Sequence, residues 1–595
     1  MGSLSIIGKA PILNKLINHK RVRVFQILIG LVLSFSALTS GCKKTEMPSD
    51  NPENFVIDSI RVLSINNEPL YVNYNINNTR IDALVENDGI SGKVFKVQFV
   101  FPNGITPLSI TPDISKSVDF KNPVVFEIQY TSAIKKSYTF TLNEEATNPA
   151  RYIIESVQVL NEDNSGANIK LSQAGNDYIG LTQNQIPGKK YKLKITFPSK
   201  IVPISILPDP NSVTDFSKEV VFTVKYDDQI VKTYTVKIGN YNTSDFTRKV
   251  VRGVWVSDVG SDVFASKANI AECINICKDI GINTIFVVTY NDAKTKYKSQ
   301  VMKEYMGVEI DPKYTGRDPL AEMIEAAKPH GINVVAWFEY GFASVYGDNT
   351  GGALIAKYPS WASRDAAGSI TEKNKFYWLD AFNPDVQQFV KKMMVEVVQK
   401  YPDLAGVQGD DRLPALASNG GYNATVTALY KTETGRTAPS NFLDSHWLQW
   451  RANKLSDFGE YIFKHIKSLN GKQMVSWSPS PYSWSLQNYL QDWPEWMRRN
   501  IVDHLHPQLY RTNFNDYKAS FDQAMTNLAP FNFKELIFSP GVLVGIGSGD
   551  SVTPDILDQK LAYNRSKGID GETFFYYERI RKNKAFQDVI KKHNK

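Results

Sequence analysis

The chain has 595 residues, enough for several hydrophobic cores, and its 42% hydrophobic and 22% charged residues are typical of globular proteins. Its formal net charge of +7 is small for this length, and the basic residues are scattered apart from an N-terminal group, so nothing indicates a nucleic-acid-binding surface. Aromatic residues make up 12% of the chain, a content that suits both ordinary cores and platforms for sugar rings.

The N-terminal segment has the pattern of an export signal. Basic residues precede an apolar run of 15 residues, 24–38, which is short for a membrane span. The run leads through Thr39-Ser40-Gly41 to Cys42, and small residues before a lone cysteine resemble a bacterial lipoprotein signal. We therefore expect removal of residues 1–41, lipidation of Cys42, and a tether over 42–53 that anchors the chain to a membrane of the bacterial cell envelope, facing the periplasm or the cell surface. A plain signal peptide and a single anchor helix are the alternatives, and all three place the chain outside the cytoplasm.

Two further cysteines, Cys273 and Cys277, are four residues apart on an expected helix and therefore share one of its faces. A metal site would need more ligands nearby. We expect two buried free thiols and no metal.

A repeat follows the tether. Five short patterns recur at an offset of 96 residues: Phe101-Pro102 as Phe197-Pro198, Pro112-Asp113 as Pro208-Asp209, Asp119-Phe120 as Asp215-Phe216, Val124-Val125-Phe126 as Val220-Val221-Phe222, and Tyr138-Thr139 as Tyr234-Thr235. Segments 93–101, 190–197 and 220–226 alternate apolar and polar residues with the period of a strand. The repeat predicts two small all-β, immunoglobulin-like sandwiches, at 54–146 and 150–240. They resemble the tandem β-sandwich domains of exported Bacteroidetes-type lipoproteins, and either a spacer or a glycan-binding role remains open.

Residues 248–595 predict a third domain, in which apolar runs alternate with helical segments, as in βα units. The eight expected strands are 251–257, 284–289, 333–339, 404–409, 473–478, 502–510, 535–539 and 571–577. Examples of the expected helices are 270–280, 319–330, 384–401, 448–469 and 554–567. Asp318-Pro319 and Asn383-Pro384 have the pattern of an N-cap followed by proline in the first turn. Eight such units predict a (β/α)₈ TIM barrel.

Carboxylates follow the third and fourth of these strands. Asp410, Asp411 and Arg412 come directly after one apolar run, and Glu339 ends another. In such barrels the carboxyl ends of the strands build the active site. Glycoside hydrolysis needs one carboxyl group to protonate the leaving oxygen and another to attack or to activate water. We therefore predict Glu339 as the proton donor and Asp410 or Asp411 as the nucleophile or base. A helix cap with a surface ion pair is the alternative for the aspartates.

The other candidates for substrate contact lie at the ends of further strands or in inserted loops: Trp255, Asn291, Trp337, Tyr340, Trp378, Arg412, Trp477, His506, Gln508, Tyr510 and Glu578. The indoles would stack on sugar rings or wall them, while His506 and Gln508 would bond hydroxyl groups. Arg412 would keep a neighbouring aspartate ionised. A core position for Trp255 and Trp337, an internal role for His506 and an ion pair of Glu578 with Arg579 are the alternatives.

Five ordered motifs in this region resemble the glycosyl hydrolase-like family ten. They are Arg252-Gly253-Val254-Trp255, Ala336-Trp337-Phe338-Glu339-Tyr340-Gly341-Phe342, Gly409-Asp410-Asp411-Arg412-Leu413-Pro414, Trp450-Arg451 and Pro507-Gln508-Leu509-Tyr510-Arg511. The resemblance covers about 249–595 and implies a TIM barrel, glycoside hydrolase activity and no cofactor. Characterised relatives act on bacterial cell-wall glycan, so peptidoglycan strands become a candidate polysaccharide substrate beside dietary and host polysaccharides.

Two other functions remain open. A glycan-binding lipoprotein without catalysis would use the same carboxylates only to bond hydroxyl groups. A metal-dependent hydrolase would use Asp410, Asp411 and His506 as ligands, although no His-x-His or His-Glu-x-x-His spacing supports it. The sequence leaves open the linkage, the stereochemical course, the role of each aspartate and the oligomeric state.

Overall fold

The computed structural model describes residues 52–594 except 68, 71, 87–93, 103–104, 146–151, 184–187, 200, 228, 242–249, 532–536 and 547–550. The predicted signal, Cys42 and the tether up to residue 51 lie outside the described residues. In the part that is described, no helix combines the length and the apolar character needed to cross a membrane. The chain divides into two compact units, Met1–Thr147 and Asn148–Lys595.

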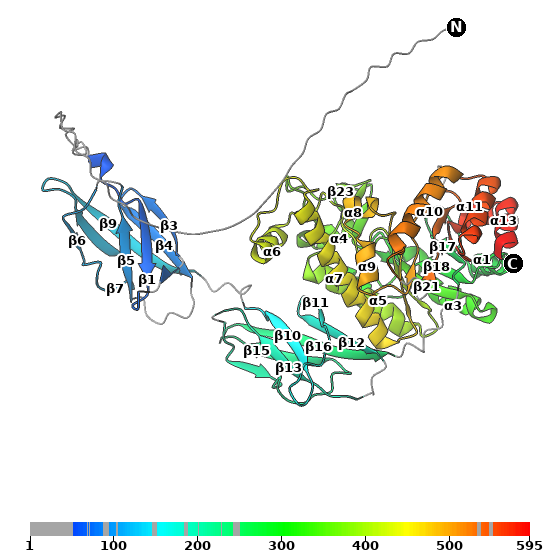
Figure 1. Cartoon of the computed structure of the whole chain (residues 1–595), viewed down its shortest axis with the longest axis horizontal. Coiled ribbons are helices and arrows are strands. Elements are labelled where there is room, and N and C mark those ends of the chain that lie inside the picture. Colours follow the sequence, from blue (N-terminus) through cyan, green and yellow to red (C-terminus); the bar gives the residue numbers. More distant parts are fainter. Residues whose placement is uncertain are drawn as a thin grey trace, which may run out of the picture. The chain divides into compact units, whose positions relative to one another are not determined.

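The first unit holds the first sequence copy, folded as two sheets around one core (Figure 1). Its elements are a 3₁₀ turn at Pro52–Asn54 and strands β1 (Ser59–Leu63), β2 (Pro69–Leu70), β3 (Val72–Asn77), β4 (Arg80–Glu86), β5 (Val94–Val100), β6 (Ser109–Thr111), β7 (Val118–Asp119), β8 (Val124–Gln129) and β9 (Lys135–Glu145). One sheet has the order β2-β1-β5-β7 and the other β3-β4-β9-β8-β6. Phe95, Val97 and Phe99 of β5 are buried while their neighbours reach solvent, which confirms the alternation expected for 93–101.

The second copy repeats this arrangement within the second unit. Its strands are β10 (Ser156–Leu160), β11 (Ser172–Ala174), β12 (Asp177–Gln183), β13 (Lys192–Thr196), β14 (Ser205–Leu207), β15 (Val220–Lys225) and β16 (Val231–Tyr241). β12 pairs in parallel with β16, as β4 does with β9. The buried hydroxyl pair Tyr130–Tyr138, 3.1 Å apart, recurs as Tyr226–Tyr234 at 2.9 Å. The strands expected in both copies are confirmed, while the immunoglobulin-like assignment and the domain limits stay predictions.

The second copy packs against two barrel helices, α5 (Pro384–Lys400) and α7 (Ser445–Leu469), a contact that the sequence did not predict. Lys464 donates to the Lys170 carbonyl at 2.8 Å and to Ser172 Oγ at 2.9 Å, and Lys391 pairs with Asp177 at 3.2 Å. A Cβ on Gly239 would lie 2.3 Å from Ser468 Cβ, so the close approach of β16 to α7 requires glycine there. The second copy and the barrel therefore share one compact unit.

The barrel has eight parallel strand positions with helices around them (Figure 1). The strands are β17 (Gly253–Val256), β18 (Thr284–Val288), β21 (Asn333–Phe338), β25 (Gly406–Gly409), β26 (Met474–Trp477), β27 (His504–Leu505), β28 (Ile537–Phe538), β29 (Gly541–Leu543) and β30 (Thr573–Phe575). β28 and β29 are two pieces of the seventh strand, separated by Ser539 and Pro540. Because β28 pairs with β27 and β29 with β30, the ring closes through this segment. Each expected strand contains an observed one, which confirms the TIM-barrel-like fold.

Short sheets lie in the inserted loops: β19 (Tyr290–Asn291) with β20 (Lys294–Thr295), and β22 (Ala343–Tyr346), β23 (Glu372–Lys373) and β24 (Phe376–Trp378). The other helices are α1 (Lys267–Asp279), α2 (Gln300–Met306), α3 (Pro319–Ala327), α4 (Gly352–Lys357), α6 (Ala424–Thr434), α8 (Trp484–Tyr489), α9 (Trp493–Arg498), α10 (Phe514–Leu528), α11 (Pro554–Ser566), α12 (Tyr577–Arg581) and α13 (Lys584–Asn594), with 3₁₀ turns at Pro312–Tyr314, Lys328–His330 and Pro359–Trp361.

The expected helix caps are confirmed. Asp318 accepts from Ala321 N and Asn383 from Asp385 N, so each satisfies a backbone donor of the first turn. The helix expected from residue 448 begins earlier, at Ser445, because Asp444 caps it by accepting from two backbone amides. Cys273 and Cys277 are buried free thiols, as expected.

Candidate active site

A two-residue hairpin after β18 carries the first polar group of the site. β19 pairs antiparallel with β20, and the connecting residues Asp292 and Ala293 have φ of 46° and 54°. Positive φ at both central positions is the geometry of hairpin turns whose twist matches that of the strands. The hairpin holds Asn291, 4% exposed, between the ends of β17 and β21.

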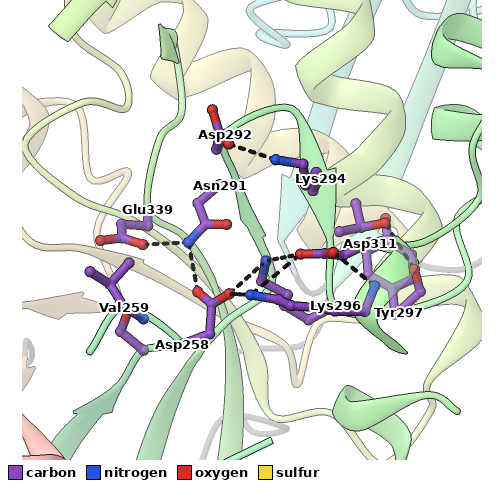
Figure 2. Close-up of polar contacts among 12 residues, drawn as sticks. Asp258, Val259, Asn291, Asp292, Lys294, Lys296, Tyr297, Asp311 and Glu339 are labelled. Atoms are coloured by element: carbon purple, nitrogen blue, oxygen red, sulfur yellow. Dashed lines mark hydrogen bonds and ion pairs between the residues drawn. The ribbon is translucent and has the colours of Figure 1, made fainter. Parts of the chain in front are cut away.

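A buried ion network lies behind Asn291 (Figure 2). Lys296, 1% exposed, pairs with Asp258 at 3.0 Å and with Asp311 at 3.3 Å, and Lys313 pairs with Asp258 at 2.7 Å. Burial alone would raise the pKa of Asp258, but Lys296 and the hydrogen bonds from Lys313 and Asn291 outweigh it and lower the pKa to about 2. Asp258 is therefore a fixed negative charge. The lysines and Asp311 were not among the predicted site residues.

Glu339 follows β21 and is partly exposed. Its Oε2 accepts from Asn291 Nδ2 at 3.0 Å, and its backbone carbonyl accepts from Arg412 Nε at 2.8 Å. Burial raises the pKa of Glu339, while Arg412 and the hydrogen bond from Asn291 act in the opposite direction. A carboxyl group with a raised pKa at the mouth of the barrel has the property that a general acid needs.

Asp410 and Asp411 share one guanidinium but differ in exposure. Arg412 Nη2 lies 3.1 Å from Asp410 Oδ2, and its Nη1 lies 3.1 Å from Asp411 Oδ1. The Asp410 side chain is 1% exposed and also accepts from Trp337 Nε1 at 3.1 Å, while the Asp411 side chain is 17% exposed. Burial raises the pKa of Asp410 well above its usual range, against the positive charge of Arg412 and with the negative charge of Asp411. Asp411 is thus the aspartate that can be reached from solvent.

Arg412 joins the ends of β21 and β25. It contacts both aspartates and the Glu339 backbone, and its guanidinium carbon lies 4.6 Å from the centre of the Phe376 ring and 5.9 Å from that of Tyr340. The charges of Arg412 and Glu339 both act on Asp410. The three predicted catalytic carboxyl groups are therefore brought together at one end of the barrel, with Tyr340 beside them.

The predicted indoles lie deeper than a stacking role requires. Trp255, Trp337, Trp378 and Trp477 are exposed by 1%, 3%, 0% and 1%. Three of their N–H groups bond within the protein: Trp255 to Gln408 Oε1 at 2.7 Å, Trp337 to Asp410, and Trp477 to the Ile501 carbonyl at 2.9 Å. Because protein already covers their faces, these rings form the packed wall behind the site and offer no surface for a sugar ring in this structure.

His506 is also internal. It is fully buried, its Nδ1 lies 3.0 Å from the Ser539 carbonyl and 2.9 Å from Thr573 Oγ1, and burial lowers its pKa to about 3. A neutral histidine enclosed by the barrel strands has no open path to a sugar hydroxyl here. In the part of the chain that the structure describes, no group of three or more His, Cys, Asp or Glu side chains is placed to hold a metal ion.

Gln508 and Tyr510 are partly exposed and follow β27. Gln508 Nε2 donates to the Ser478 carbonyl at 3.0 Å, and the Tyr510 ring stacks on Phe575 with centroids 5.2 Å apart. The aspartates both act on the Tyr510 hydroxyl electrostatically, so this ring faces the carboxyl cluster. Gln508 and Tyr510 keep the partial exposure that contact with a substrate needs.

Glu578 lies at the edge of the barrel mouth. It is 3% exposed, accepts from Ser261 Oγ at 2.7 Å, and pairs with Lys582 at 2.9 Å and Arg581 at 3.4 Å. It lines an open pocket of about 580 Å³ with Ser261, Arg581 and Lys582 among others. Its ion-pair partners are therefore Arg581 and Lys582, and the simple pair with Arg579 is not formed.

Arg451 holds the loops around the site in place, a role that the sequence did not predict. It is fully buried on α7 and donates to the carbonyls of Ser418, Gly420 and Phe442, each at 2.6 Å. Its guanidinium also lies 4.5 Å from the Trp447 ring. Arg451 therefore ties the loop after β25 and the loop before α7 to one helix.

Substituting Arg451 with lysine is expected to lower the free energy of unfolding by about 1–3 kcal/mol, since one ammonium cannot reach three carbonyls in a fixed plane. Denaturant unfolding followed by tryptophan fluorescence measures the change. Lys454→Arg, a charge-conserving change one turn later on the more exposed face of α7, is the matched control. Equal stability of Arg451→Lys and the wild type would contradict this role.

Asp380 predicts a pH dependence of stability. It is 2% exposed, accepts from Phe382 N at 3.1 Å, and burial raises its pKa from 3.8 to about 7. Because the unfolded chain ionises this group at much lower pH, the fold loses stability through Asp380 as the pH rises from about 4 to about 7. Between pH 5 and pH 6 the stability of the wild type should fall relative to Asp380→Asn by about 1.4 kcal/mol. A pH-independent difference between the two proteins in denaturant unfolding would refute this.

Comparison with known proteins locates the site within a recognised family. Residues 250–546 match the family model described as Glycosyl hydrolase-like 10. Glycosyl hydrolase DigH of Escherichia coli K12 is 24% identical over 310 residues, which is 45% of this chain and 67% of DigH. Glycosyl hydrolase YngK of Bacillus subtilis is 25% identical over 314 residues, 47% of this chain and 58% of YngK.

Two solved structures align with this chain at lower identity. The glycoside hydrolase domain of PgaB (BpsB) from Bordetella bronchiseptica aligns with a TM-score of 0.45 and 14% identity, over 57% of this chain and 99% of that domain. The catalytic domain of β-amylase from Paenibacillus polymyxa aligns with a TM-score of 0.42 and 9% identity, over 58% of this chain and 98% of that domain.

Proposed function

Residues 250–546 form a domain of the glycosyl hydrolase-like 10 family, and from this premise we propose that the barrel hydrolyses O-glycosidic bonds of a polysaccharide by carboxylate acid–base chemistry. The observation that carries the proposal is the grouping of three carboxyl residues around Arg412 at the carboxyl ends of β21 and β25. Arg412 forms ion pairs with the side chains of Asp410 and Asp411 and donates to the backbone carbonyl of Glu339, whose own carboxyl charge acts on Asp410.

The differing environments of the three groups support different roles. Glu339, partly exposed and with a raised pKa, is the proton donor to the leaving oxygen. Asp411, the aspartate with solvent access, is the nucleophile or the base that activates water. Asp410 is enclosed by Trp337 and Arg412, and its bonds to them hold the Trp337 and Arg412 side chains in place. Tyr340, Gln508 and Tyr510 keep enough exposure to contact the glycan.

The substrate and location are the finer part of the proposal. The lipoprotein-like N-terminus would export the chain and anchor it through Cys42 to an envelope membrane, where it meets cell-wall glycan. We therefore take peptidoglycan glycan strands as the first candidate substrate. Glycan binding without catalysis is the second candidate function, because Arg412 pairs with both aspartates and carboxylates held in this way can also serve only as acceptors for hydroxyl groups.

Incubation of the purified protein with glycan strands, with and without stem peptides, and with plant and host polysaccharides distinguishes the two functions. Release of reducing ends supports the hydrolase, while co-sedimentation with glycan and no release supports the binding protein. Asp411→Asn should abolish release and retain binding. Asp403→Asn, at the opposite end of the β25 segment and half exposed, is the matched control and should keep full activity. Full activity of both Asp410→Asn and Asp411→Asn would refute the catalytic assignment.

A further inference from the structure

Asn291 lies between the carboxyl groups of Asp258 and Glu339. Its Nδ2 is 2.9 Å from Asp258 Oδ1 and 3.0 Å from Glu339 Oε2 (Figure 2). A side-chain amide nitrogen carries two hydrogens, so both are used in these bonds. Asn291 is 4% exposed, which leaves it little room to turn toward a substrate.

Asp258 fixes the orientation of the Asn291 amide. The ion pairs with Lys296 and Lys313 keep the Asp258 carboxylate charged, and Asp311 holds Lys296 from its other side at 3.3 Å. A flipped amide would place its carbonyl oxygen against this carboxylate and lose a hydrogen bond to a charged group. The nitrogen therefore faces Asp258, and its second N–H is aimed at Glu339.

The orientation determines which oxygen of Glu339 carries the proton. An oxygen that receives an N–H is the carbonyl-type acceptor of the protonated carboxyl group, so the hydroxyl is the other oxygen. We propose that Asn291 is a positioning residue that holds Oε2 of Glu339 as an acceptor and so places the transferable proton on Oε1. Asn291 then acts through Glu339. It does not contact the sugar, contrary to the prediction from the sequence.

This inference rests on the proposed hydrolase function. During cleavage the Oε1 proton passes to the glycosidic oxygen as the bond from that oxygen to the anomeric carbon breaks, and Glu339 becomes a carboxylate. The Asn291 N–H, already in place, stabilises this carboxylate without reorganisation. In a retaining course Asp411 bonds to the anomeric carbon as the leaving oxygen departs, and the water that later displaces Asp411 gives a proton to Glu339. In an inverting course water bonds to the anomeric carbon directly, Asp411 takes its proton, and solvent returns a proton to Glu339.

Several charged groups face Glu339 and contribute to its pKa. Arg412 and Asp410 approach from the β25 loop, Asp258 from the end of β17, Lys296 from beyond β20, and Tyr340 adjoins it. Among them Asn291 contributes a hydrogen bond that favours the ionised form. Removing this bond should raise the pKa of Glu339 while leaving the charges in place.

The direct test is titration of the Glu339 carboxyl by ¹³C NMR in the wild type and in Asn291→Ala, with the signal assigned by its loss in Glu339→Gln. The midpoint should rise by about one pH unit in Asn291→Ala. The basic limb of the kcat/KM profile should move upward by the same amount, since activity requires protonated Glu339. Asn291→Ser, which keeps one donor, should shift both measurements less and serves if Asn291→Ala does not fold.

Asn283→Ala is the matched control. Asn283 lies just before β18, at the opposite end of the strand that leads to Asn291, and it bonds the Val250 carbonyl at 2.7 Å and accepts from Arg252 N at 2.9 Å. Its loss removes a structural asparagine without touching the site and should leave the Glu339 midpoint unchanged. An unchanged midpoint in folded Asn291→Ala or Asn291→Ser overturns the inference. If the Glu339 midpoint shifts as expected in the Asn291 variants but the wild type releases no reducing ends, the inference on Asn291 holds and the hydrolase function is refuted.

Discussion

Replacing Glu339 with glutamine is expected to lower kcat by about 10²- to 10⁴-fold on a natural glycan, because the amide has no proton to give to the leaving oxygen. Glutamine keeps the shape of the side chain and can still accept from Asn291, so the loss should come from chemistry and not from unfolding. Initial rates of reducing-end release from glycan strands measure it.

The dependence on the leaving group distinguishes a lost acid from a damaged site. An aryl glycoside with a dinitrophenolate leaving group needs little protonation, so cleavage of its bond should fall far less in Glu339→Gln than cleavage of the natural linkage. Glu325→Gln, an exposed change on α3, is the matched control and should leave both rates unchanged. Equal losses on both substrates would contradict the role of proton donor.

Replacing Lys296 with methionine is expected to lower the free energy of unfolding by about 3–5 kcal/mol, because it leaves a buried ion network with a missing partner. The Asp258 side chain is 7% and that of Asp311 9% exposed, and both pair with this lysine. Asp258 keeps Lys313 and Asn291, whereas the ion pair left to Asp311 is the longer contact with Lys313 at 3.6 Å. Methionine has the length of lysine, so packing changes little.

Tryptophan fluorescence during denaturant unfolding is suited to this measurement, because all ten tryptophans lie between residues 255 and 496, within the barrel. Lys294→Met is the matched control in the same hairpin. Lys294 is 45% exposed and pairs with the 43% exposed Asp292, so its loss should change stability by at most about 1 kcal/mol. Equal effects of the two substitutions would show that the Lys296 network contributes no more than a surface pair.

The strand ends and the main carboxyl groups could be predicted because they depend on local pattern. A buried parallel strand is apolar along its whole length, so the change to Asp410 and Asp411 after Val407 marks its end. The same contrast identified Glu339. The helix caps Asp318 and Asn383 could also be predicted, because a cap residue bonds backbone amides in the first turn of the helix that follows it.

The ion network could not be predicted in this way. The segment 294–298 has a lysine at every second position, a pattern typical of a solvent-exposed segment. Lys294 and Lys298 are indeed exposed, but Lys296 is buried. Lys296 is buried because a hairpin with two non-glycine residues at positive φ turns it toward Asp258 and Asp311. Such a turn has no strong sequence signal when glycine is absent.

The burial of the tryptophan side chains could likewise not be predicted from the sequence. Tryptophan at a strand end suits a sugar platform and a barrel core equally, and the choice depends on which neighbours cover the ring. Here Trp255 packs against Phe286, His506, Tyr510 and Phe575, a contact set assembled from three other strand regions.

The packing of the second β-copy on α5 and α7 has a practical consequence for choosing a fragment to express. Ala174 and Ile179 belong to the same hydrophobic cluster as the barrel core, and Lys464 of α7 finds its backbone acceptor on the copy. A truncation starting near the first barrel strand would leave that flank bare and prone to self-association. The shortest fragment that retains this cover starts close to residue 148.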